Sequence, residues 1–158
     1  MWAYALCEIG GDYATTVGNS IDDMFDRISS ANNTLYFHNL KFDGEFIIYW
    51  LFRNGYTFVK DAKELEEKTF TTLISNMNVF YTITICHKKS GRNKICTKII
   101  DSLKIIPFSV EEIAKSFKLP ISKLEIDYKA KREVGHILTE QEIEYIKNDV
   151  RIVAMALS

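Results

Sequence analysis

The chain has 158 residues, of which 47% are hydrophobic and 26% charged, and its formal net charge is −1. This balance is typical of a globular protein and excludes a disordered, collagen-like or proline-rich chain. Apolar runs such as Phe46–Phe52 are far shorter than the ~20 residues of a membrane-spanning helix, which excludes a membrane partner. We expect one domain over residues 1–158, in the cytoplasm, with its three cysteines reduced.

The first third of the chain predicts a hairpin, a helix, a strand and a second helix. The hairpin strands, Trp2–Ile9 and Tyr13–Val17, flank a glycine-rich turn. Ser20 begins the first helix, with an acidic residue three positions later as in a capping box. The next strand is expected at Thr34–His38 and the second helix at Phe42–Arg53. The inward residues of this second helix are expected to be Phe46, Ile47, Trp50 and Leu51.

The rest of the chain predicts a second hairpin and two more helices. Charged residues between 61 and 69 indicate a solvated loop or a short helix. Alternation with a period of two predicts a strand at Asn78–His87, and its partner at Lys94–Asp101 follows a basic turn. The last two helices are expected at Val110–Phe117 and from the capping box at Thr139 to the end of the chain. This order predicts an α/β fold with at least one antiparallel section.

The basic turn permits two interpretations. Its four cationic residues are Lys88, Lys89, Arg92 and Lys94. Such turns are usually solvated surface, but this one can also contact a nucleic-acid backbone. In the flanking strands, Cys86 and Cys96 are placed to face each other as reduced thiols.

Three side chains suit metal-dependent chemistry, each with a plainer alternative. Asp43 lies where a strand ends and a helix begins, so it can bind a metal or simply cap the helix. Tyr145 and Asp149 are four residues apart, which places them on one helical face. A phenol and a carboxylate on one face can orient a water beside a metal, or can form an ordinary solvent-facing pair.

Taken in order, these segments resemble the exonuclease motifs of family B DNA polymerases, and most closely those of the protein-primed group found in phages and linear plasmids. Asn39–Asp43 is similar to the second exonuclease motif and Tyr145–Asp149 to the third. Ser102–Ile106 resembles the group's Ser/Thr-Leu-x-x-hydrophobic motif, and Lys123 falls where the group places a catalytic lysine. The resemblance covers almost the whole chain, and four motifs in register make it specific.

This resemblance implies a ribonuclease-H-like α/β fold, a mixed sheet with flanking helices, and a 3′–5′ proofreading exonuclease that belongs to a DNA polymerase. In the family, two Mg²⁺ or Mn²⁺ ions held by carboxylates hydrolyse the phosphodiester bond. The implied metal ligands are Asp43 and Asp149. Tyr145 would orient the attacking water, and Lys123 would oppose the charge that develops on the phosphate. The residues implied to hold single-stranded DNA are Tyr36, His38, Asn39, Phe42, Ser102 and Leu103, with Phe42 stacked on a base.

One family motif is not found where the resemblance places it. No Asp-x-Glu precedes Trp2, so two of the four implied carboxylates and the first strand of the family fold are missing. We therefore expect a fragment with little nuclease activity of its own. In the parent polymerase the partners would be the 3′ end of single-stranded DNA and the terminal protein, in the bacterial host of a phage, plasmid or mobile element.

Two alternatives to the exonuclease interpretation stay open. One is a catalytically dead module that binds single-stranded DNA, and the other is a remnant that only folds and associates. The missing strand would lie between Trp2–Ile9 and Thr34–His38. An unpaired strand edge invites pairing with another chain, so we expect a homo-oligomer or a foreign strand there.

Overall fold

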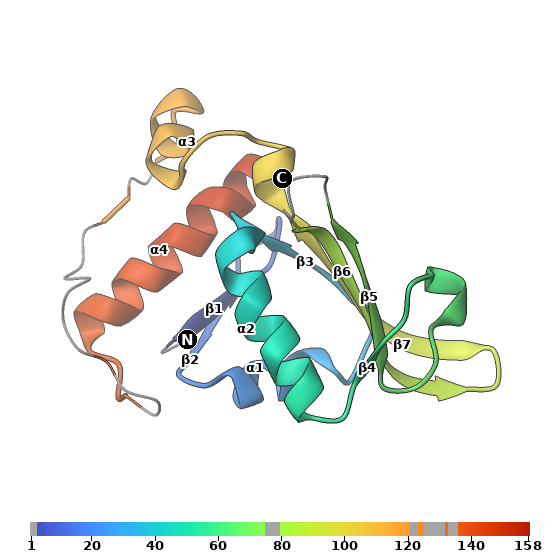
Figure 1. Ribbon diagram of the computed structural model, residues 1–158. Helices are drawn as coiled ribbons and strands as arrows, with labels where there is room; N and C mark the ends of the chain where they lie inside the picture. The colour runs from blue at the N-terminus through green and yellow to red at the C-terminus, as the bar shows by residue number, and fades with distance from the viewer. Residues whose placement is uncertain (1–2, 75–79, 121–122, 125–131, 133–135) are drawn as a thin grey trace. The chain divides into compact units, whose positions relative to one another are not determined.

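The computed structural model describes residues 3–74, 80–120, 123–124, 132 and 136–158 (Figure 1). The chain divides into two compact units, each of which is described by itself. The first consists of Met1–Met24 with Phe108–Ser158, and the second of Phe25–Pro107. No helix in the described part of the chain is long and apolar enough to cross a membrane.

The first unit joins a small hairpin to the last two helices. Its elements are β1 (Tyr4–Cys7), β2 (Thr15–Gly18), α3 (Val110–Ser116) and α4 (Glu140–Leu157). β1 and β2 pair antiparallel, which confirms the predicted hairpin, and α4 packs against both strands and against α3. Capping boxes begin both helices, at Ser109 and, as predicted, at Thr139.

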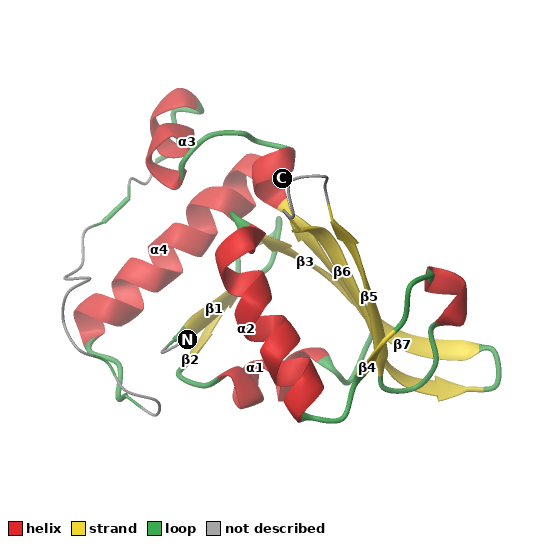
Figure 2. Ribbon diagram, in the orientation of Figure 1, coloured by secondary structure: helices red, strands yellow, loops and turns green. Residues whose placement is uncertain are grey.

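The second unit is built on a five-stranded mixed sheet (Figure 2). Its strand order is β3-β7-β6-β5-β4, with β3 parallel to β7 and with β7, β6 and β5 antiparallel in turn. The strands are β3 (Asn33–Phe37), β4 (Thr57–Phe58), β5 (Thr69–Ile74), β6 (Phe80–Ser90) and β7 (Asn93–Asp101). The helical elements are α2 (Leu40–Arg53), the 3₁₀ turns η1 (Ala62–Glu64) and η2 (Ser102–Lys104), and α1 (Ile21–Ile28), which begins in the first unit.

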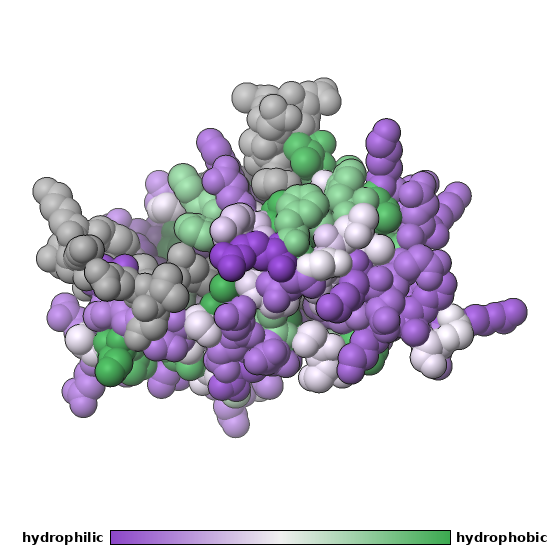
Figure 3. All heavy atoms as spheres, turned by 60° about the horizontal axis from the view of Figure 1, so that its bottom comes forward, coloured by the Kyte–Doolittle hydropathy of each residue, from purple (hydrophilic) through white to green (hydrophobic). Residues whose placement is uncertain are grey.

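Helix α2 buries one face and leaves aromatic side chains on the other. Ile47 and Leu51 are fully buried, and the ring of Trp50 stacks on Phe25 with centroids 3.7 Å apart. The prediction that Phe46 points inward is wrong, since its side chain is 47% exposed. An apolar run such as that of α2 hides its periodicity, so sequence alone cannot tell its two faces apart. Figure 3 shows hydrophobic and hydrophilic residues interspersed on the face that it presents.

A buried polar chain crosses the core of the second unit. The Tyr56 hydroxyl is hydrogen bonded to Nδ1 of His87 at 2.9 Å, and Nε2 of His87 to the Thr97 hydroxyl at 2.9 Å. Because Thr97 donates its own proton to the carbonyl of Ile28, its oxygen accepts from Nε2–H and leaves Nδ1 to accept from Tyr56. His87 is therefore a neutral histidine, and burial lowers its pKa to about 4.

Several expected boundaries differ from the observed ones. In the second hairpin β6 continues to Ser90 and β7 begins at Asn93, so two of the basic residues expected in the turn lie in β6. One of them, Lys89, forms an ion pair with Glu66 at 2.7 Å. Cys86 and Cys96 are cross-strand partners, as expected. Strand β5 was not expected, because its threonines and apolar residues follow a charged segment that indicates a loop. Residues 78–79 of the expected β6 strand lie outside the described residues.

Candidate functional site

Two segments with candidate DNA-binding residues leave the sheet at the same edge. Strands β3 and β7 are parallel, and Phe37 at the end of β3 is in register with Asp101 at the end of β7. The carboxyl ends of adjacent parallel strands form an edge where α/β proteins commonly bind ligands. A hydrogen bond of 3.0 Å between Nδ1 of His38 and the Ser102 hydroxyl joins the two segments beyond this edge.

Asn39, rather than Asp43, occupies the capping position of α2. Asn39 has φ 73° and ψ 62°, a left-handed conformation that Asn tolerates better than most residues, and its side chain makes no capping hydrogen bond. Asp43 lies in the first turn of the helix, four residues after Asn39, so the capping interpretation of this carboxylate is wrong. Burial raises the pKa of the Asp43 carboxyl above its ordinary value.

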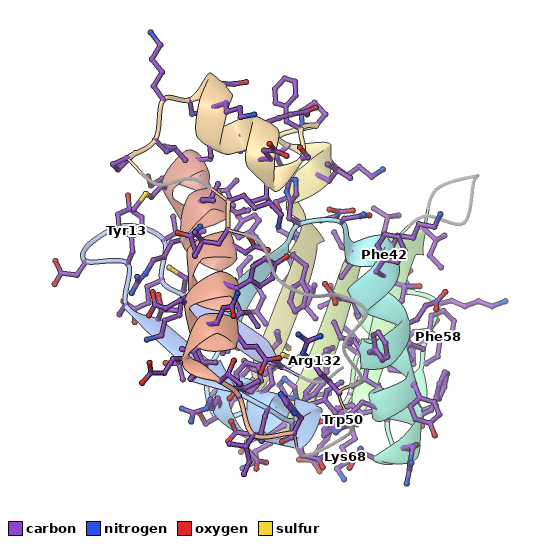
Figure 4. All side chains as sticks on the ribbon, turned by 90° about the vertical axis from the view of Figure 1, so that its left-hand side faces the viewer. Tyr13, Phe42, Trp50, Phe58, Lys68 and Arg132 are labelled. Carbon is purple, nitrogen blue, oxygen red and sulfur yellow. The ribbon has the colours of Figure 1, made fainter. Side chains whose placement is uncertain are left out.

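The aromatic residues of this edge are accessible. Phe42 is 64% exposed and lies at the first turn of α2 (Figure 4), and Tyr36 is 37% exposed. An exposed aromatic ring can stack on any base, because every base has a π-face. Ser102, in contrast, is fully buried against His38, and Leu103 is half-buried. All six candidate DNA-binding residues and Asp43 belong to the second unit.

Lys123, Tyr145 and Asp149 come together in the first unit. The Lys123 ammonium donates hydrogen bonds to both carboxylate oxygens of Asp149, at 3.0 and 2.9 Å, and to the Tyr145 hydroxyl at 3.1 Å. The two helical residues share a face, as their spacing predicts, but the solvent-facing alternative is wrong because Tyr145 is 8% exposed. Burial disfavours the charge of Lys123, yet the bonds to Asp149 and Tyr145 outweigh it and raise the pKa of the ammonium.

The candidate metal ligands have the right chemistry for a hard divalent cation. Carboxylate oxygens are the ligands that Mg²⁺ and Mn²⁺ prefer. Both oxygens of Asp149 already face a positive charge, that of the Lys123 ammonium. Among the residues that the structure describes, no three His, Cys, Asp or Glu side chains gather as metal ligands do. Asp43 and Asp149 belong to different units, so their proximity stays a prediction.

Asp101 has a part at this edge that was not expected from the sequence. Its side chain is 1% exposed, and Oδ1 accepts hydrogen bonds from the backbone N–H groups of Asn39, at 3.0 Å, and Leu103, at 2.9 Å. An aspartate that ends a strand just before a helical turn is a typical capping residue, and that signal could have identified it.

Comparison with known proteins identifies the family of the chain. The family model for DNA polymerase type B, organellar and viral, matches residues 26–141. The chain belongs to this family. Among curated members it is 47% identical to the DNA polymerase of Bacillus phage B103 and 46% identical to that of Bacillus phage phi29, each over 99% of the chain. It is 30% identical to the DNA polymerase of Streptococcus phage Cp-1 over 92% of the chain.

Solved structures of a type B polymerase share the fold. Phi29 DNA polymerase complexed with single-stranded DNA matches with a TM-score of 0.91 and 46% identity, over 99% of this chain. The same polymerase with primer-template DNA and incoming nucleotides matches with a TM-score of 0.90. These matches confirm the predicted ribonuclease-H-like α/β fold. The chain spans 27% of the length of the two Bacillus phage polymerases and of these structures, and 22% of the length of the Streptococcus phage Cp-1 polymerase.

Proposed function

We propose that this chain is the 3′–5′ exonuclease part of a protein-primed, phage-type DNA polymerase and that it holds the 3′ end of single-stranded DNA. The observation that supports this most directly is the common edge of β3 and β7, where Asn39, the exposed ring of Phe42 and Leu103 are brought together. The likeness to phi29 polymerase complexed with single-stranded DNA supports the same assignment.

In this proposal the two units supply different parts of the reaction. Phe42 stacks on the terminal base, Asn39 donates a hydrogen bond to the terminal nucleotide, and Tyr36, His38 and Leu103 extend the contact surface. Ser102 is fully buried, so its part is to hold His38 through their hydrogen bond. In the whole polymerase, Asp43 and Asp149 would be two of the carboxylates that hold the divalent metals, Mg²⁺ or Mn²⁺, and the bound metals would supply an activated water and stabilise the leaving oxygen. Tyr145 orients that water, and Lys123 opposes the charge that develops on the phosphate. In this proposal the whole polymerase has the terminal protein as a partner. It acts in the cytoplasm of a phage-infected bacterium.

A titration and a nuclease assay test the proposal. We expect the chain to bind a short 5′-fluorescein-labelled oligo(dT), measured by fluorescence anisotropy in EDTA, and to prefer it to circular oligo(dT), which has no 3′ end. Equal affinity for the two oligonucleotides would contradict a 3′-end site and leave only general binding of single strands. No binding at all would favour a remnant that only folds and associates.

The nuclease assay is expected to show little cleavage in Mn²⁺. Two carboxylates cannot fix the geometry of two metals, and stabilisation of the transition state depends on that geometry. Robust removal of 3′ nucleotides that Asp43→Ala abolishes would show that another group replaces the Asp-x-Glu motif. Light scattering on the same samples tests the expected homo-oligomer.

A further inference from the structure

The carboxylate of Asp101 connects the two segments that carry the proposed DNA-binding residues. Its Oδ1 accepts from the backbone N–H of Asn39, at 3.0 Å, and from that of Leu103, at 2.9 Å. Hydrogen bonds to an ionised acceptor are shorter and stronger than those between neutral groups. A single oxygen atom therefore fixes the spacing between the start of α2 and the start of η2.

This arrangement is unfavourable for Asp101 itself. The residue is 1% exposed, and its Oδ2 has no hydrogen-bond partner among the described residues. Buried polar atoms are nearly always hydrogen bonded, so an exception calls for an explanation. A cap on a 3₁₀ turn as short as η2 does not require a buried carboxylate, since a serine or asparagine serves as well.

The backbone of Asn39 supplies the explanation. Its left-handed conformation, φ 73° and ψ 62°, is sparsely populated by residues other than glycine. Such conformations persist where the surrounding structure holds them, and they cluster at ligand-binding sites. Asp101 holds this one through the N–H of Asn39, and the Asn39 side chain is not used to cap α2.

We propose that Asp101 is a positioning residue, which holds Asn39 and Leu103 in the one geometry that accepts the 3′ end of single-stranded DNA. This inference rests on the proposed function, because it assigns a purpose to the spacing between two proposed DNA-binding residues. Asp101 acts through their backbone N–H groups and does not itself touch the DNA.

Substitutions of Asp101, with a control on the same strand, test this role. Asp101→Ala removes the shared acceptor, and we expect affinity for linear oligo(dT) to fall about tenfold, as expected when a charged hydrogen-bond partner is lost. Asp101→Asn keeps an Oδ1 acceptor and should retain affinity within about threefold. Thr97→Val is the control, since Thr97 is a fully buried residue of β7 whose hydroxyl contacts His87 and Ile28 instead, and it should leave affinity unchanged.

Two outcomes of the titration would overturn the proposal. If Thr97→Val weakens binding as much as Asp101→Ala, the role of Asp101 is only to stabilise β7. If Asp101→Asn loses as much affinity as Asp101→Ala, the negative charge acts on the DNA site directly rather than by positioning the backbone.

Amide hydrogen exchange separates this inference from the proposed function. In Asp101→Asn the exchange rates of the Asn39 and Leu103 amides should stay close to those of the parent, whereas in Asp101→Ala both should rise about tenfold or more relative to Thr97→Val. Failure of the parent chain to bind oligo(dT) would refute the proposed function, yet the exchange rates would still decide whether Asp101 positions these amides. Equal rates in Asp101→Ala and Thr97→Val would overturn the inference. If Asp101→Ala does not fold, Asp101→Asn provides the test. The inference would be overturned if Asp101→Asn has the urea unfolding of the parent chain but exchanges both the Asn39 and the Leu103 amide protons fast.

Discussion

The two parts of the candidate site are held in place by different forces. At the edge of β3 and β7, buried groups and backbone hydrogen bonds set the geometry, with Asp101 at 1% exposure. On α4, a partly exposed ion pair sets it, since the side chains of Lys123 and Asp149 are 27% and 25% exposed. Buried hydrogen bonds are shielded from solvent ions, whereas an exposed ion pair is screened by them. The two regions should therefore respond differently to acid, to truncation and to salt.

Acid should produce the largest difference, and the second unit should respond first. The pKa of His87 is about 4 in the folded protein and about 6.5 in the unfolded chain. Above pH 6.5 both states are neutral, and as the pH falls from 6.5 to 4 only the unfolded state gains the proton. The free energy of unfolding should fall by roughly 3 kcal/mol over this range and then level off. Urea unfolding followed by the fluorescence of Trp50, in a Trp2→Phe background, measures this loss.

The first unit should respond to acid only at lower pH. Glu142 accepts hydrogen bonds from His136, from the backbone of Thr139 and from Arg132, which together lower its pKa to about 2. Its contribution to stability is complete above about pH 4.5 and is lost as the pH falls toward 2. A His87→Gln variant should flatten the loss between pH 6.5 and 4 and leave the lower transition unchanged. A single transition at the same pH in both proteins would contradict this comparison.

Truncation of the exposed ring at the sheet edge should have the next largest effect. Phe42→Ala should weaken binding of linear oligo(dT) by about 1–3 kcal/mol, the usual contribution of one stacked base. Phe52→Ala is the matched control, because Phe52 is 57% exposed on the same helix but lies almost three turns away. Equal losses in the two variants, measured by fluorescence anisotropy, would show that binding to α2 is not specific to its first turn.

Salt should produce the smallest difference, and within the candidate site it should act on the ion pair of Lys123 with Asp149. A double-mutant cycle with Lys123→Ala and Asp149→Ala should give a coupling of about 0.2–1 kcal/mol in the free energy of unfolding, as partly exposed ion pairs do. The coupling should shrink in 1 M salt, where the Debye length is about 3 Å. The pair Lys115 and Glu111 on α3, which is far more exposed, should show a smaller coupling. A coupling that does not change with salt would mean that the α4 face is held like the sheet edge.

Local sequence signals predicted much of the fold. The capping box at Thr139, the glycine turn of the first hairpin and the four-residue spacing of Tyr145 and Asp149 all act within a few residues, so the structure reproduces them without tertiary help. The same reasoning failed at β5 and at Phe46, because both depend on which neighbours cover a segment. Asp43 could be recognised as a candidate ligand, but only the structure showed that Asn39 occupies the cap position.

The sequence by itself determined the α/β order of the elements and the residue types that suit the proposed chemistry, because these depend on composition and on periodicity along the chain. The family followed from the resemblance of its motifs to those of known polymerases. Only the tertiary structure decided that β3 pairs in parallel with β7, which brings Asn39 beside Asp101 although 62 residues separate them. It also decided which aromatic rings of α2 are left exposed and that Asp101 is buried. These features depend on contacts between segments far apart in the chain, and the residues near a segment in the sequence carry no record of such contacts.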